Sequence, residues 1–90
     1  MATATVEIVN RKGLHARAAA AFAKTSRRFR CIIKVSRGGT TVSGDSIMGL
    51  MMLSAAKGTT IDIATEGDDA DEAQAALLAL VAEGFGEGSD

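Results

Sequence analysis

The chain has 90 residues, of which 47% are hydrophobic, enough for one domain with a modest core and too few for two. It contains no run of 18 apolar residues, so we expect no membrane span. Its Thr- and Val-rich N-terminus lacks the cationic segment of a signal peptide. The single cysteine, Cys31, excludes an internal disulfide and fits the reducing cytoplasm.

The formal net charge of −1 conceals two oppositely charged halves. All ten Lys and Arg residues lie at or before Lys57, and nine of the eleven acids follow it. A basic surface attracts acidic proteins or nucleic acids. Because the chain has no Tyr or Trp to stack on bases and no RNA-binding motif, we expect protein partners and no nucleic acid.

The first half of the chain has the pattern of a strand, a helix and a hairpin. Apolar and polar residues alternate over residues 3–9, which is typical of a half-buried strand. After a polar loop, the alanine-rich segment 16–27 predicts a helix with Phe22 as its one large core residue. Two further strands, 29–36 and 40–43, flank a Gly-Gly pair that permits the positive φ angles of a two-residue hairpin.

The next segments predict a short helix and a fourth strand. The helix covers residues 47 to 52 or 53, and either Asp45 or Ser46 can cap it. The strand covers residues 59–66 and directs Ile61 and Ile63 inward.

The last helix begins in an acidic cluster. Asp69 and Glu72 have the spacing of a capping box, and apolar residues recur at helical spacing over 73–84. The cluster lacks the alternating ligands of a calcium loop, so we expect no metal site. The order β-α-β-β-α-β-α predicts an α+β open-faced sandwich over residues 1–90, a single domain with a four-stranded antiparallel sheet and three helices on one face.

The candidate functional segment is Lys12-Gly13-Leu14-His15-Ala16-Arg17, which holds the only histidine of the chain. His15 directly precedes the alanine-rich helix, so we expect it at the N-cap and Arg17 in the first turn. Backbone N–H groups there have no intrahelical partner, and the helix dipole is positive, which favours an anion. An imidazole beside a guanidinium is suited to carry a phosphoryl group on nitrogen. The alternative is that His15 only caps the helix.

Residues 13–17 resemble the active-site signature Gly-Leu-His-Ala-Arg-Pro-Ala of the HPr family, the histidine-containing phosphocarriers of the bacterial phosphotransferase system. Ala18 departs from this pattern, because the family usually has proline there. Residues 46–53 resemble the family's regulatory-serine segment, and residues 77–87 resemble its last helix. The tail and Ala18 are more similar to the nitrogen-related branch, NPr, than to the sugar branch.

The resemblance implies a cytoplasmic, monomeric phosphocarrier that is itself transiently phosphorylated, is not a turnover enzyme and needs no cofactor. In this family the donor is enzyme I, which is charged from phosphoenolpyruvate, and the acceptor is an EIIA protein. His15 would carry the phosphoryl group on Nδ1 and Arg17 would be its charge partner. Ser46 would be the target of an HPr kinase/phosphorylase.

The short helix at 47–53 is part of the family's docking surface. We expect Leu50 and Leu53 in the core, although methionines at helical spacing are often core residues too. The predicted docking residues are Ile47, Met48, Met51, Lys24 and Arg27.

Two other classes of function compete with this interpretation. A small α+β regulatory or binding module could use the basic surface without covalent chemistry. Its binding would weaken steeply with salt and would survive His15→Ala. An acylphosphatase-like hydrolase would need an Arg and Asn phosphate cradle, which we do not find in the sequence.

Overall fold

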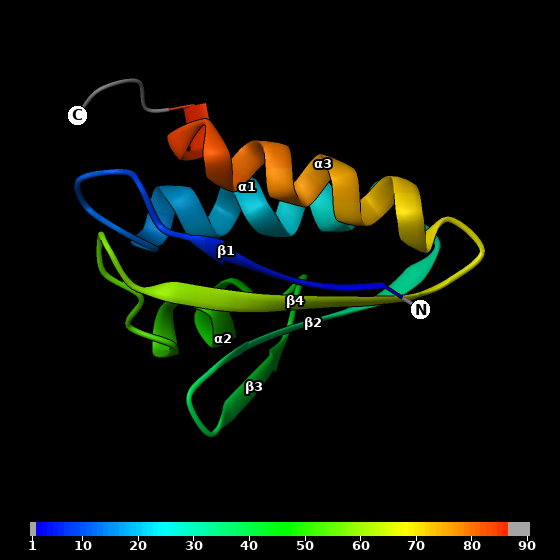
Figure 1. Cartoon of the computed structure of the whole chain (residues 1–90), viewed down its shortest axis with the longest axis horizontal. Helices are drawn as coiled ribbons and strands as arrows, with labels where there is room; N and C mark the ends of the chain where they lie inside the picture. The colour runs from blue at the N-terminus through cyan, green and yellow to red at the C-terminus, as the bar shows by residue number, and fades with distance from the viewer. Residues whose placement is uncertain (1, 87–90) are drawn as a thin grey trace.

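The computed structural model describes residues 2–86 and has the predicted order of strands and helices (Figure 1). The elements are β1 (Ala2–Glu7), α1 (Ala16–Ser26), β2 (Cys31–Arg37), β3 (Thr40–Ser43), α2 (Ile47–Met52), β4 (Thr60–Gly67), α3 (Ala70–Ala82) and a 3-10 turn, η1 (Gly84–Gly86).

The four strands form one antiparallel sheet with the order β1-β4-β2-β3. β4 and β2 are central, and Val35 of β2 pairs with Val42 on one side and with Ile63 on the other. Arg37 pairs with Thr40 across the predicted two-residue hairpin loop, in which Gly38 has a φ of +63°.

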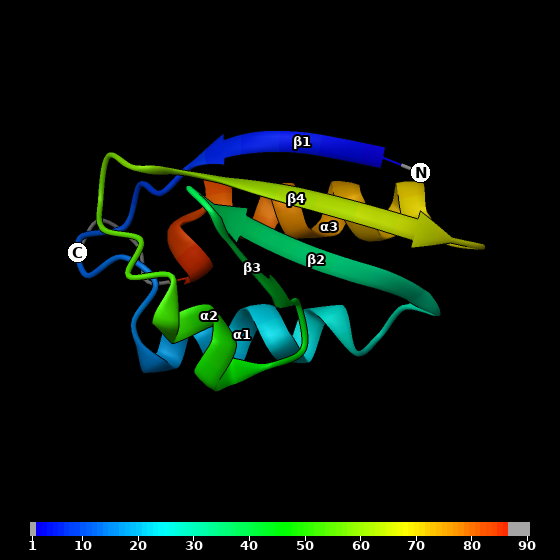
Figure 2. The ribbon, with the colours of Figure 1, turned by 90° about the horizontal axis from the view of Figure 1, so that it is seen from below.

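One hydrophobic core lies between the sheet and the helices (Figures 1 and 2). α1 and α3 lie side by side, while α2 packs against α1 and the edge strand β3. The predicted core residues contribute to this core: Phe22, Leu50, Leu53, Ile61, Ile63 and Leu77. The predicted α+β open-faced sandwich is therefore confirmed.

The predicted capping box at the start of α3 is wrong. Asp69 holds the N-cap position, but its side chain makes no cap hydrogen bond, and Glu72 is exposed. Asp69 Oδ2 instead accepts a hydrogen bond of 2.8 Å from the backbone N–H of Arg30. The turn before α3 lies beside the start of β2, where Cys31 pairs with Gly67, so the carboxylate ties these two segments together.

Cys31 is a half-buried structural residue beside this turn and packs against the core. Burial raises the pKa of its thiol, and the neighbouring Asp69 carboxylate raises it further. The thiol therefore stays protonated at neutral pH, which makes it a poor nucleophile.

α3 ends at Ala82, and the chain then turns at η1, which packs against both α3 and α1. Phe85 has a φ of +59°, in the left-handed region that few non-glycine residues adopt, and its ring is buried. Glu87, part of the segment that resembles the family's last helix, lies outside the described residues. Between residues 2 and 86, no helix combines the length and the apolar character needed to cross a membrane.

Replacing Asp69 should cost more stability than replacing Glu72. Asp69→Ala removes the acceptor for the Arg30 N–H and should lower the free energy of unfolding by about 1–2 kcal/mol. Glu72→Ala should change it by less than about 0.5 kcal/mol, because the side chain is exposed. Urea unfolding of both variants measures the difference, and equal losses would support the capping box instead.

Candidate functional site

A hydrogen-bonded loop between β1 and α1 sets the position of His15. The backbone carbonyl of Asn10 accepts from the Gly13 N–H at 3.2 Å, and Asn10 Nδ2 donates to the Gly13 carbonyl at 2.7 Å. The same Gly13 carbonyl accepts from the backbone N–H of His15 at 2.9 Å. The residue that precedes α1 is thus held by the loop before it.

The segment after α2 supports this loop from the other side. Leu14 is buried, and its N–H donates to the carbonyl of Ala55 at 2.9 Å. Gly13 has a φ of +66°, and a Cβ atom there would lie only 2.4 Å from the Ala55 oxygen. The position therefore requires glycine, both for its backbone conformation and for the space available.

His15 occupies the N-cap of α1, as predicted, with an extended backbone at φ −80° and ψ −176°. Its carbonyl accepts the first helical hydrogen bond from Ala19, and its Nδ1 accepts from the backbone N–H of Arg17 at 3.3 Å. A ring nitrogen that accepts carries a lone pair, so this geometry assigns the proton of the neutral imidazole to Nε2. The half-buried ring therefore directs the Nδ1 lone pair towards the start of the helix.

The first turn of α1 is suited to an anion. This turn contains no acidic residue, and the side chain of Arg17 is exposed. The N–H groups of the turn lie at the positive end of the helix dipole. Across residues 2–86 no group of three or more His, Cys, Asp and Glu side chains could hold a metal ion.

α1 and α2 lie side by side and run in opposite directions. Leu14, before α1, bonds to Ala55, after α2, and at the other end Arg27 Nη2 donates to the Asp45 carbonyl at 3.0 Å. The exposed faces of the two helices consequently adjoin, with His15 near one end.

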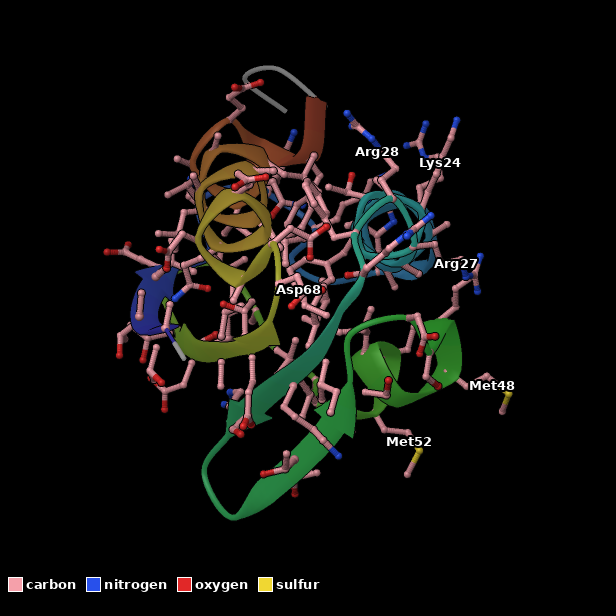
Figure 3. All side chains as sticks on the ribbon, turned by 90° about the vertical axis from the view of Figure 1, so that its right-hand side faces the viewer. Lys24, Arg27, Arg28, Met48, Met52 and Asp68 are labelled. Carbon is pink, nitrogen blue, oxygen red and sulfur yellow. The ribbon has the colours of Figure 1, made fainter. Side chains whose placement is uncertain are left out.

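Methionines dominate the exposed face of α2. Met48 is 76% exposed, Met52 72% and Met51 43%, while Ile47 is half-buried. Lys24 of α1 and Arg27, the C-cap of α1, lie on the same side of the molecule as Met48 (Figure 3). We call this face the α1–α2 surface and define it by the following residues: His15, Arg17, Lys24, Arg27, Ile47, Met48, Met51 and Met52.

Sequence reasoning missed Met52 as part of this surface. Met52 follows Met48 by four residues, a spacing that places both side chains on one face of a helix. This spacing could have predicted that Met52 belongs to the surface. Leu50, by contrast, is fully buried as predicted.

Ser46 is the N-cap of α2, one of the two predicted possibilities. Its Oγ accepts from the Gly49 N–H at 3.1 Å, and its carbonyl accepts from the Leu50 N–H at 2.9 Å. Asp45 does not cap the helix; its Oδ1 accepts from the Ser43 hydroxyl at 2.6 Å.

Comparisons with known proteins agree with this architecture. The family model described as the phosphorylation site of the PTS HPr component matches residues 2–83. The HPr phosphocarrier of Neisseria meningitidis serogroup A is 49% identical over 84 residues, which cover 93% of this chain and 94% of that protein. HPr from Cupriavidus necator is 49% identical over 81 residues, which cover 90% of this chain and 91% of that protein.

Solved structures show the same fold. HPr-C-His from Thermoanaerobacter tengcongensis superposes with a TM-score of 0.92 at 42% identity, covering 97% of this chain and 98% of that one. HPr from Bacillus anthracis superposes with a TM-score of 0.85 at 42% identity, covering 89% of this chain and 95% of that one. The chain therefore belongs to the HPr family of phosphocarriers of the phosphotransferase system.

Proposed function

We propose that the chain accepts a phosphoryl group on Nδ1 of His15 from enzyme I and passes it to an EIIA protein. The observation that carries this proposal is the hydrogen bond from the Arg17 N–H to Nδ1, which directs a nucleophilic lone pair to a helix N-terminus. A neutral imidazole carries a nitrogen lone pair and can attack phosphorus without a separate base.

Each transfer exchanges one bond to phosphorus for another. The Nδ1 lone pair of His15 forms the new N–P bond while the bond between phosphorus and the donor breaks, and Nε2 keeps its proton. In the second step the acceptor forms its own bond to phosphorus and the N–P bond of His15 breaks. The Nε2–H tautomer assigned from the geometry has its lone pair on the nitrogen that must react.

The first turn of α1 supports the charge of the phosphoryl group. In the phosphorylated form, the Arg17 N–H that now donates to Nδ1 can donate to a phosphoryl oxygen instead. The exposed Arg17 guanidinium can reach the same oxygens as a charge partner.

We propose the α1–α2 surface as the docking face for both partners. Flexible, polarizable methionines suit a surface that must accept more than one protein. Lys24 and Arg27 lie on the same side of the molecule as Met48 and would attract acidic partner surfaces (Figure 3).

We further propose Ser46 as the target of an HPr kinase/phosphorylase. Phosphorylation would add a charge of about −1.5 to −2 at the N-cap of α2, where N–H groups favour an anion. This charge would lie beside the α1–α2 surface, so its main effect falls on partner binding.

Replacing His15 by asparagine should abolish phosphorylation and preserve the fold. Asparagine is a good N-cap, so its side chain can take over the hydrogen bond from the Arg17 N–H while offering no nucleophilic nitrogen. Wild type incubated with enzyme I and phosphoenolpyruvate should gain one acid-labile phosphoryl group by mass spectrometry, and the variant none. Uptake of acid-labile phosphate by the variant would overturn the proposal. To identify the acceptor, the phosphorylated wild-type protein is mixed with EIIA proteins of the sugar branch and of the nitrogen branch, and phosphoryl transfer to each is measured.

Charge on the α1–α2 surface should weaken docking without unfolding the protein. Met48→Glu places a carboxylate on a residue that is 76% exposed, and it should raise the Kd for enzyme I by about tenfold or more. The free energy of unfolding should change by less than about 0.5 kcal/mol. Ala75→Glu, on the exposed face of α3, adds the same charge elsewhere and is the control. Unchanged affinity of Met48→Glu, measured by calorimetry, would exclude Met48 from the docking face.

The charge at Ser46, and not its size or capping ability, should govern transfer to His15. Ser46→Asp should slow enzyme I-dependent phosphorylation of His15, because the new carboxylate repels an acidic partner. Ser46→Asn is the matched control, since asparagine caps a helix about as well and is neutral. If the aspartate and asparagine variants react at the same rate as wild type, Ser46 acts only as a cap.

A further inference from the structure

We propose that Asn10 is a positioning residue for phosphoryl transfer, because its side chain amide fixes the Gly13 carbonyl that holds the backbone of His15. The functional part of this inference rests on the proposed role of His15 as phosphoryl acceptor.

Asn10 and Gly13 are joined by two hydrogen bonds of opposite direction. The Asn10 carbonyl accepts from the Gly13 N–H at 3.2 Å, and Asn10 Nδ2 donates to the Gly13 carbonyl at 2.7 Å. Asn10 is 1% exposed, so water cannot replace the side chain contact. The loop is thus closed by a specific amide and not by backbone pairing alone.

The Gly13 carbonyl relays this constraint to the acceptor residue. A carbonyl oxygen has two lone pairs, and here it accepts both from Asn10 Nδ2 and from the backbone N–H of His15, the latter at 2.9 Å. The hydrogen bond from the His15 N–H restricts the φ angle of His15 and therefore the direction in which its imidazole projects. Asn10 therefore lies two hydrogen bonds away from the residue that reacts.

The imidazole is sensitive to such a constraint. The contact between Nδ1 and the Arg17 N–H is 3.3 Å, which is long for a hydrogen bond, so a small rotation of His15 would break it. Transfer requires the lone pair to face phosphorus in line with the leaving atom, and small errors of placement slow such reactions strongly.

The C-terminal turn keeps Asn10 in place. Gly84 is buried, and a Cβ atom there would lie 3.4 Å from the Asn10 Cβ, so the η1 backbone covers this side chain. Phe85, next in the chain, is buried and anchors η1 to the core that includes α1. The Asn10 side chain is therefore shielded from solvent, and η1 limits the space in which it can move.

The experiment compares Asn10→Ala and Asn10→Asp with wild type and with Gln74→Ala. Gln74 is the matched control, because it too is a buried amide, and its Nε2 donates to the Ile63 carbonyl in β4 at 3.1 Å. Asn10→Asp keeps the size of the side chain and loses the donor, which provides a second variant if alanine leaves the protein unfolded.

Two readouts are taken on folded protein, as judged by the amide spectrum. Nitrogen-15 NMR of the imidazole reports which ring nitrogen of His15 carries the proton and how far its lone pair is engaged. Single-turnover phosphorylation from phosphorylated enzyme I gives the rate at saturation and the concentration for half-maximal rate.

We expect both Asn10 variants to shift the Nδ1 signal and to lower the saturating rate by about tenfold or more, with the half-saturating concentration within about twofold of wild type. That split separates positioning from docking. Gln74→Ala should match wild type in both readouts, even though it also loses a buried hydrogen bond. Asn10 variants with an unchanged His15 spectrum and an unchanged saturating rate would overturn the proposal. If wild type accepts no phosphate at all, the proposed function fails, and the NMR comparison still decides whether Asn10 orients His15.

Discussion

The two hydrogen bonds accepted by the Gly13 carbonyl are the constraint on which the site depends. One comes from the buried side-chain amide of Asn10, in the loop after β1, and the other from the backbone N–H of His15, so both ends of this loop segment share one acceptor. Gly13 can occupy this point only because it has no Cβ atom to meet the Ala55 carbonyl. These two hydrogen bonds hold the backbone of His15, from which its imidazole projects.

Most of the fold can be predicted from the sequence because each strand and helix has its own periodic pattern of apolar residues. Alternation in β1, helical spacing around Phe22 and Leu50, and a Gly-Gly hairpin are local patterns, and each describes an element with one buried face. The N-cap positions of His15 and Ser46 are local as well, and the structure has both. Agreement among such local signals explains why element order and core could be predicted together.

The predictions that failed, or were never made, concern contacts between distant segments. Asp69 has the local spacing of a capping box, but the N–H that it accepts from belongs to Arg30, 39 residues earlier. Asn10 lies in a segment whose composition is that of an ordinary polar loop. Its burial depends on η1, which packs against it from the other end of the sequence. Met52 lay within the helical pattern, yet its exposure depends on how α2 is turned against α1. Packing between segments that are distant in the sequence decides these roles, and a single sequence does not encode it as a local pattern.

A phosphocarrier must stabilise its phosphoryl group enough to carry it, but not so strongly that transfer to the acceptor becomes slow. Buried, fully paired anion sites stabilise a phosphate strongly, and a group bound in that way would be slow to leave. A phosphoryl group on His15 would meet backbone N–H donors at a helix end and an arginine whose side chain is exposed to water. Exposed charge pairs contribute only about 0–1 kcal/mol, so the phosphorylated state would not be a deep energy minimum. Orientation, in contrast, can be rigid at no cost to reversibility, because it lowers the barrier for arrival and departure alike. The buried hydrogen bonds of Asn10 and Leu14 hold the backbone next to His15, while the Arg17 side chain is exposed, and such an arrangement would suit a reversible carrier.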